Sequence, residues 1–175
     1  SKLLAGTKVK IATVIGFPLG ANAGNVKAIE ALEAFKAGAN EVDMVINIGA
    51  LKDQKEDIVQ KEIEEVVAIA KKQPSEKIVK VIIETALLTQ EEKTKACNII
   101  LKAGAHFVKT STGFSSGGAT IQDIKLLKSI VREQVLIKAS GGIKNYETAS
   151  AMLEAGANRI GTSSGVEILR GHQTK

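Results

Sequence analysis

The stretch LKAGAHFVKTS, residues 101–111, runs from the end of a predicted helix through an Ala-Gly-Ala turn into a predicted strand. The same pattern recurs in FKAGANEVDMVI, residues 35–46, and in LEAGANRIGTS, residues 153–163. Glycine suits the left-handed residue that ends a helix, and its small neighbours allow the helix to pack closely on the strand that follows. The repeat therefore predicts a chain built from helix, turn and strand in strict succession.

Three further runs have the composition of buried strands: VKIATVIGF, KIVKVIIET and VLIKASGG, at residues 9–17, 77–85 and 135–142. The helical stretches between the six strands have apolar residues three and four positions apart, and they cover residues 25–36, 55–72, 89–102, 120–132 and 145–154. Strands dense in Val and Ile that alternate with helices are typical of a parallel sheet covered by helices.

Two α/β folds have this order of elements. A repeating unit of about 30 residues, without an opening G-x-G-x-x-G motif, favours a (β/α)8 TIM barrel over an open doubly wound sheet. A complete barrel has eight strands, so six strands correspond to about six of the eight β/α units. With 175 residues, of which 44% are hydrophobic, we expect a single, partial barrel domain over residues 1–175.

Composition narrows the class of partner. Only three of the 24 basic residues are arginine, and the chain has one Tyr and no Trp, so the net charge of +5 indicates a lysine-rich surface and no nucleic-acid site. No run approaches the roughly 18 apolar residues of a membrane span, and the first residues lack a signal-peptide pattern. We therefore expect a cytoplasmic protein without a membrane partner. The histidines and the cysteine have no metal-ligand spacing.

Two lysines lie inside apolar strands, Lys109 in FVKTSTG and Lys138 in LIKASG. Burying an ammonium is costly, so such a lysine pairs, turns outward or loses its proton. If both face the barrel interior on neighbouring strands about 5 Å apart, they repel by roughly 3 kcal/mol, equivalent to about two pKa units. One of them would then be partly neutral near pH 7, as a Schiff-base amine requires. The alternative is that each lysine pairs separately with a carboxylate.

Carboxylates and small-residue loops follow the strands, where barrel enzymes build their sites. Asp43, in EVDMVI, could act as a general acid or base beside a lysine, or could simply form a salt bridge with it. Glu84, at the end of VIIET, is a less specific candidate. The loops SGGI and GTSSG, residues 140–143 and 161–165, follow the last two strands, where barrels commonly bind a substrate phosphate.

Together these segments resemble one family. VKIATVIGFPLGA, EVDMVINIGAL, KVIIETALL, FVKTSTGF, IKASGGI and RIGTSSG, in this order, are similar to the deoxyribose-phosphate aldolases, class I aldolases with the (β/α)8 fold. The resemblance implies reversible cleavage of 2-deoxy-D-ribose 5-phosphate to D-glyceraldehyde 3-phosphate and acetaldehyde. It implies a phosphorylated sugar as the substrate, and neither a metal nor an organic cofactor.

The resemblance also implies roles for residues of this chain. Lys109 corresponds to the Schiff-base lysine, Lys138 to the second lysine beside it, and Asp43 to the proton-relay carboxylate. The expected substrate and phosphate contacts are Thr112, Gly141, Gly142, Ser163 and Ser164.

Some positions depart from the family pattern. The family has two more strands before the one that opens this chain, Phe114 stands where some relatives have a lysine near the phosphate, and the tail lacks their C-terminal tyrosine. Tyr146 lies in a predicted helix and does not replace that tyrosine. Unpaired sheet edges predict association, with a homodimer as the expected state. The alternatives to an active aldolase are a truncated, weak or inactive barrel fragment, and another phosphate-binding barrel such as a decarboxylase or epimerase.

Overall fold

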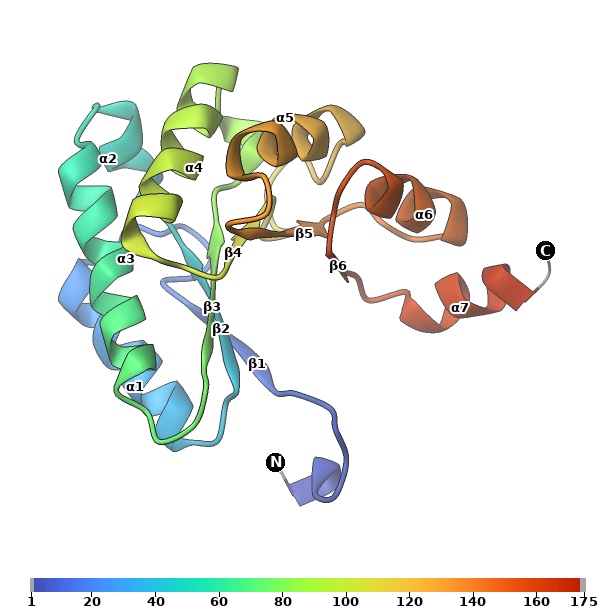
Figure 1. Cartoon of the computed structure of the whole chain (residues 1–175), viewed down its shortest axis with the longest axis horizontal. Coiled ribbons are helices and arrows are strands. Elements are labelled where there is room, and N and C mark those ends of the chain that lie inside the picture. The colour runs from blue at the N-terminus through green and yellow to red at the C-terminus, as the bar shows by residue number, and fades with distance from the viewer. Residues whose placement is uncertain (1, 174–175) are drawn as a thin grey trace.

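The computed structural model describes residues 2–173, and they form one curved, six-stranded sheet (Figure 1). The strands lie side by side in sequence order and every neighbouring pair is parallel, as predicted. Their bounds are β1 Ala12–Ile15, β2 Glu41–Val45, β3 Ile78–Ile82, β4 Phe107–Lys109, β5 Leu136–Ser140 and β6 Arg159–Gly161. The sheet is therefore a half-barrel rather than a closed one, with β1 and β6 at its edges.

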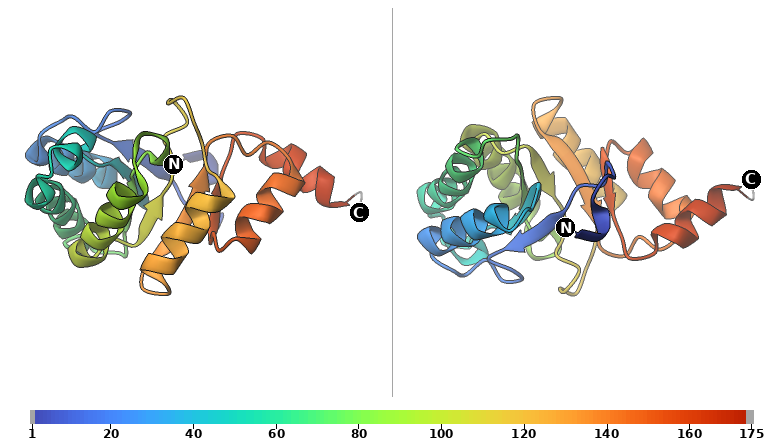
Figure 2. Two further views of the ribbon diagram at one scale, coloured as in Figure 1. Left: turned by 90° about the horizontal axis from the view of Figure 1, so that it is seen from above. Right: turned by 90° about the horizontal axis from the view of Figure 1, so that it is seen from below.

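Helices connect the strands and lie on the outer side of the curve (Figure 2). The five predicted helices are present as α1 Gly24–Lys36, α3 Glu56–Lys71, α4 Gln90–Ala103, α5 Ile121–Val131 and α6 Tyr146–Glu154. Two more helices were not predicted, α2 Ile48–Lys52 and α7 Gly165–Gln173, and short 3-10 helices cover Lys2–Leu4 and Thr85–Leu87.

Local sequence sets the helix ends. Thr89 caps α4 with a reciprocal capping box, in which its side chain accepts from the backbone N–H of Glu92 and the Glu92 carboxylate accepts from that of Thr89. Thr120 caps α5 without a reciprocal bond: its side-chain hydroxyl accepts from the backbone N–H of Asp123. Gly104 ends α4 with φ +72°, the left-handed conformation expected of the Ala-Gly-Ala turn.

The two faces of the sheet differ in chemistry because successive residues of a strand point to opposite sides. Outward residues such as Val42, Met44 and Val108 are fully buried in the apolar core beneath the helices. Inward residues in register with one another include Asp43 beside Lys80, and Lys109 beside Lys138. The core therefore lies between sheet and helices, and charged residues face the concave side.

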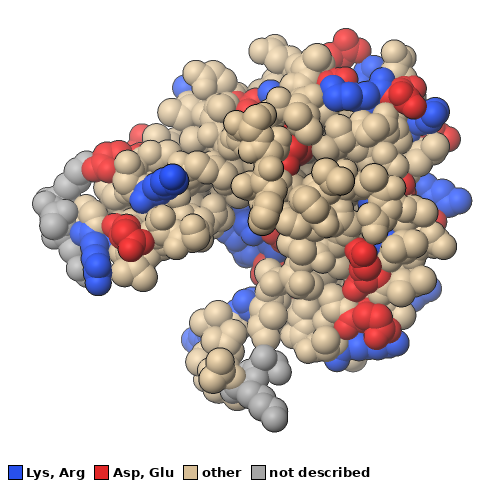
Figure 3. Space-filling view, turned by 180° about the vertical axis from the view of Figure 1, so that it is seen from behind, with Lys and Arg blue, Asp and Glu red and all other residues tan. Residues whose placement is uncertain are grey.

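The concave side is open. In the space-filling view, charged side chains are visible in the recess between the two ends of the chain (Figure 3). Val14 on edge strand β1 is 44% exposed, and none of the three residues of β6 is fully buried. Apolar and charged surface that a closed barrel would cover is thus accessible along both sheet edges.

Candidate active site

Three of the residues that the sequence singled out meet at one point. The Nζ atoms of Lys109 and Lys138 lie 2.9 and 2.8 Å from the same carboxylate oxygen, Oδ2 of Asp43. All three side chains are at most 13% exposed. The two lysines therefore share one carboxylate, and the alternative in which each pairs with a carboxylate of its own does not describe the structure.

Lys80 is a third lysine in this site, and the sequence reasoning did not single it out. Its fully buried Nζ lies 2.7 Å from Asp43 Oδ1 and 2.5 Å from Glu41 Oε2. Arg159 on β6 bonds the same Glu41 oxygen from the other side of the concave face. Lys80 stands in the apolar run IVKVII, so the argument that an ammonium inside a strand is costly could have found it.

We call Glu41, Asp43, Lys80, Lys109 and Lys138 the lysine–carboxylate cluster. Its charges perturb one another. Burial alone would raise the pKa of Asp43, but the surrounding ammonium groups outweigh burial and hold this pKa well below its ordinary value. The pKa of Lys138 is lowered, firstly by burial and also by the positive charges of the other two lysines, against the attraction of Asp43. Asp43 is thus an anion at neutral pH, and Lys138 releases its proton more readily than an ordinary lysine.

The cluster opens into a cavity of about 750 Å³. Its lining includes most of the predicted site residues: Lys109, Thr112, Lys138, Gly141, Gly142 and Ser163. Ser164 is not part of this lining; it immediately precedes α7, where its carbonyl accepts from the N–H of Ile168. Lys144 also lines the cavity and adds a positive charge that the sequence reasoning overlooked.

Two loops shape the cavity wall through close backbone contact. The N–H of Ala119 donates to the carbonyls of Ser140 and Gly141, both at 3.1 Å. Gly118 lies so close to Gly141 that a Cβ atom on Gly118 would meet the Gly141 carbonyl oxygen at 2.3 Å. Only glycine fits there, and the contact joins the loop after β4 to the loop after β5.

Phe114 stands at the mouth of the cavity and is 78% exposed. Its ring meets that of Phe17 edge to face, with 5.3 Å between the ring centroids. An aromatic pair therefore connects the loop after β1 with the loop after β4, at the position where the family pattern includes a lysine in some relatives.

Glu84 lies beside the cavity rather than in it. One of its carboxylate oxygens, Oε2, accepts from the backbone N–H and the side-chain hydroxyl of Thr112. Glu84 also lines a smaller cavity of about 280 Å³, which includes Thr112 and Phe114. Glu84 therefore does not line the large cavity itself but contacts Thr112, which does.

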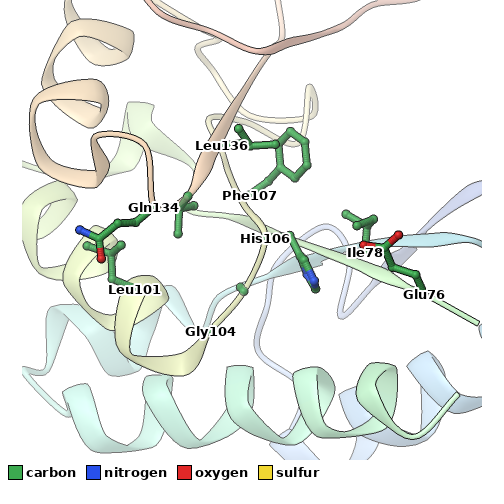
Figure 4. Close-up of a pocket in the computed structure, with 10 residues that line it drawn as sticks. Glu76, Ile78, Leu101, Gly104, His106, Phe107, Gln134 and Leu136 are labelled. Carbon is green, nitrogen blue, oxygen red and sulfur yellow. The ribbon is translucent and has the colours of Figure 1, made fainter.

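A separate cavity of about 490 Å³ lies at the opposite, amino-terminal ends of β3, β4 and β5, where Ile78, Phe107 and Leu136 begin those strands (Figure 4). None of the predicted site residues lines it. Within residues 2–173 there is no group of three His, Cys, Asp or Glu side chains placed to hold a metal ion. Likewise, no helix in the described part of the chain is long and apolar enough to cross a membrane.

Known proteins are similar to this chain in both sequence and fold. The deoxyribose-phosphate aldolases of Clostridium tetani and Enterococcus faecalis are each 60% identical to this chain, over 169 and 171 residues. These matches cover 97% and 98% of this chain and 77% and 76% of those proteins, so the chain spans about three quarters of their length. The tetrameric deoxyribose phosphate aldolase of Aeropyrum pernix is 34% identical, with a TM-score of 0.89 over 99% of this chain and 72% of its own.

A family model described as the DeoC/LacD family of aldolases matches residues 2–171. The match includes all six strands and every residue of the lysine–carboxylate cluster. The chain therefore belongs to the DeoC/LacD family of aldolases.

Proposed function

We propose that the site reversibly cleaves 2-deoxy-D-ribose 5-phosphate to D-glyceraldehyde 3-phosphate and acetaldehyde through a Schiff base on Lys109. The observation that carries the proposal is the pair of buried lysines on one carboxylate oxygen, at the edge of a cavity large enough for a sugar phosphate. The names of the relatives support the same substrate.

Schiff-base formation needs an uncharged amine. Two buried ammonium groups on one carboxylate oxygen repel each other, so the pair favours the loss of one proton. Asp43 Oδ2 bonds both ammonium groups and so connects them. In this mechanism Lys109 gives up its proton to the solvent by way of Asp43 and becomes the nucleophile.

The free amine of Lys109 attacks the sugar aldehyde, and the resulting carbinolamine loses water to form a protonated imine. The C2–C3 bond then breaks, and its electron pair moves into the imine to give an enamine. Loss of the C3 hydroxyl proton releases D-glyceraldehyde 3-phosphate. Protonation of the enamine and hydrolysis of the imine release acetaldehyde. Asp43 relays protons to and from the carbinolamine hydroxyl, a role open to a carboxylate that contacts the amine directly.

The phosphate group would lie at the far end of the cavity. Gly141, Gly142 and Ser163 line that region and leave room for a bulky anion near the backbone. Ser164 precedes the first turn of α7, where a helix end favours negative charge. The ammonium of Lys144 adds attraction from the cavity wall.

We further propose that the six strands are six units of an eight-unit barrel, and that copies of this chain associate through the open edges at β1 and β6. Partial exposure of apolar residues along β1 supports the association. Sedimentation velocity should show dimers or larger species; a monodisperse monomer would contradict this part of the proposal. Turnover by this chain alone is expected to be weak. A decarboxylase or epimerase would not require two lysines on one carboxylate, so we favour the aldolase.

Imine trapping tests the proposal directly. Acetaldehyde followed by borohydride should add an ethyl group to the peptide containing Lys109, and Lys109→Leu should abolish this labelling. Lys138→Leu should weaken it. Lys93→Leu is a matched control, because Lys93 is also an ion-paired lysine but contacts Asp123 on the helical layer. Ethylation spread over surface lysines, or located on Lys138 instead, would contradict the assignment.

A further inference from the structure

Each Ala-Gly-Ala turn is followed by a residue whose side chain bonds the backbone of the preceding β/α unit. In two of the three repeats this residue is an asparagine. Asn40 Oδ1 accepts from the backbone N–H of Ile11 at 2.9 Å, and Asn158 Oδ1 accepts from that of Ile137 at 2.8 Å. The backbone N–H of each asparagine donates in return to the carbonyl of the same partner. We call this reciprocal pair of bonds the latch of the repeat.

In the third repeat the latch residue is His106. Its Nδ1 accepts from the backbone N–H of Val79 at 3.1 Å, and its own N–H donates to the Val79 carbonyl at 3.0 Å. A ring nitrogen can accept only when it carries no hydrogen, so the hydrogen of the neutral imidazole is on Nε2. An asparagine oxygen accepts at any pH, whereas an imidazole takes up a second proton near pH 6.5 in an unfolded chain. Of the three latches, only that of His106 contains a group that titrates in this range.

We propose that His106 is an acid-sensitive latch between β3 and β4, which opens when Nδ1 is protonated. The protonated ring presents an N–H group to the N–H of Val79, and two donors cannot bond to each other. Strand β4 has only three residues, of which Lys109 is the last, and it pairs with β3 over three positions. Val79 directly precedes Lys80 on β3. Opening of the latch therefore loosens the two strands that carry Lys80 and Lys109, whatever reaction the site performs.

The surroundings of His106 set the pH at which the latch opens. The ring is half-buried and lines two cavities, of about 490 and 270 Å³, so protons from solvent can reach it (Figure 4). The charged groups around it are Glu76, Lys71, Lys77 and Lys80. Burial lowers the pKa of His106 most, and the charges of Lys71 and Lys80 lower it further against the attraction of Glu76.

The sign of the effect follows from this lowered pKa. Above about pH 6.5 the ring is neutral in the native and in the unfolded chain, and the latch stabilises the fold fully. As the pH falls below that value, the unfolded chain takes up the proton before the native chain does. The latch therefore loses its contribution to stability in mild acid and keeps it at neutral pH.

Hydrogen exchange of the unmodified chain at pH 7.5 and pH 5 tests the latch directly. The amides of Ile11, Val79 and Ile137 hold equivalent places in the three repeats, so two of them are internal controls. NMR gives a protection factor for each amide, after correction for the intrinsic pH dependence of exchange. Protection of Val79 should fall several-fold more than that of the other two. Parallel changes at all three amides would overturn the proposal.

A substitution taken from the other repeats isolates the titration. His106→Asn keeps an oxygen that can accept from Val79, and it should make the protection of that amide as insensitive to pH as that of Ile11. In urea unfolding, the unfolding constant of the unmodified chain relative to this variant should rise several-fold between pH 7.5 and pH 5. The limit is about 30-fold, set by the unfolded-state pKa of about 6.5.

His172→Asn is the matched control, because it removes the other histidine of the chain, on α7, and should leave the acid sensitivity as it is. An equal response to pH in the unmodified chain and in His106→Asn would show that another group is responsible and would overturn the proposal. If His106→Asn does not fold, the comparison of the three amides in the unmodified chain still decides.

Discussion

Asp43 is expected to be the member of the lysine–carboxylate cluster whose loss costs most. It contacts three ammonium groups at 2.7 to 2.9 Å. At an effective dielectric near 20, one such contact at about 2.8 Å corresponds to roughly 6 kcal/mol of Coulomb energy. Asp43→Asn leaves the three lysines with only Glu41 as a carboxylate, and Glu41 contacts just one of them. We expect the variant to lose about 3–5 kcal/mol of stability, the usual cost of breaking a buried ion pair.

Lys80→Met provides the comparison. It removes a fully buried charge, but Glu41 keeps Arg159 and Asp43 keeps the other two lysines. No carboxylate is left unpaired, and the methionine side chain fills similar space. The loss of stability should therefore be less than half of that in Asp43→Asn.

The stability of the Asp43→Asn variant should rise with pH. Without Asp43, the main attraction that opposes the lowered pKa of Lys138 is gone, so this pKa falls further in the native Asp43→Asn chain. The unfolded chain keeps that proton up to about pH 10.4. Because the unfolded state then binds more protons, stability rises with pH, by up to about 1.4 kcal/mol per unit.

Urea unfolding at pH 7 and pH 9 tests both expectations. Asp43→Asn should have the lower urea midpoint at pH 7 and should recover part of the difference from Lys80→Met at pH 9. Equal midpoints in the two variants at pH 7, or further destabilisation of Asp43→Asn at pH 9, would refute the reasoning.

Other parts of the structure give simpler predictions. Burial raises the pKa of the Cys97 thiol to about 12, so iodoacetamide at pH 8 should leave Cys97 unmodified, by mass spectrometry, until urea unfolds the chain. Thr89→Ala removes the capping box of α4 and should cost about 1 kcal/mol in urea unfolding, whereas Thr94→Ala, which removes a half-buried hydroxyl that bonds only the Gln90 carbonyl of the same helix, should cost less. Gly118→Ala should force the loop away from the Gly141 carbonyl and raise KM for the sugar phosphate more than it lowers kcat; an unchanged KM would contradict the proposed phosphate loop.

Much of the sheet could be predicted because strand composition and the Ala-Gly-Ala turns are local signals. The approach of Lys109 to Lys138 also followed, since both stand at matching places in consecutive strands. The position of Lys80 in an apolar strand marked it as a candidate, but its place in the cluster depends on strand register, which pairs Lys80 with Asp43 on one side and with Phe107, not Lys109, on the other. The sharing of Asp43 by the lysines depends on that register. Neither expected arrangement, two lysines that repel each other or lysines each paired with a separate carboxylate, described this sharing fully.

The left-handed backbone of Glu84 and the short helices could not be predicted from local sequence, for different reasons. A left-handed backbone is normally signalled by glycine or asparagine, and a glutamate gives no such signal. Helix α2 has only five residues, too few for an apolar period to stand out, and it begins at a side-chain cap from Asn47. Helix α7 begins at Gly165, the last residue of the polar stretch GTSSG, whose composition favoured a phosphate contact over a helix start.

The ion pair between Arg159 and Glu41 joins residues 118 positions apart in the chain, one on β6 and the other on β2. Such a bond can form only after the chain has closed a very long loop, which makes it a late event in folding. Through Glu41 it also ties the last strand to Lys80, and through Lys80 to Asp43. Detachment of β6 therefore disturbs the lysine–carboxylate cluster, and protection of the amides of β6 and β2 from hydrogen exchange should be lost together rather than strand by strand.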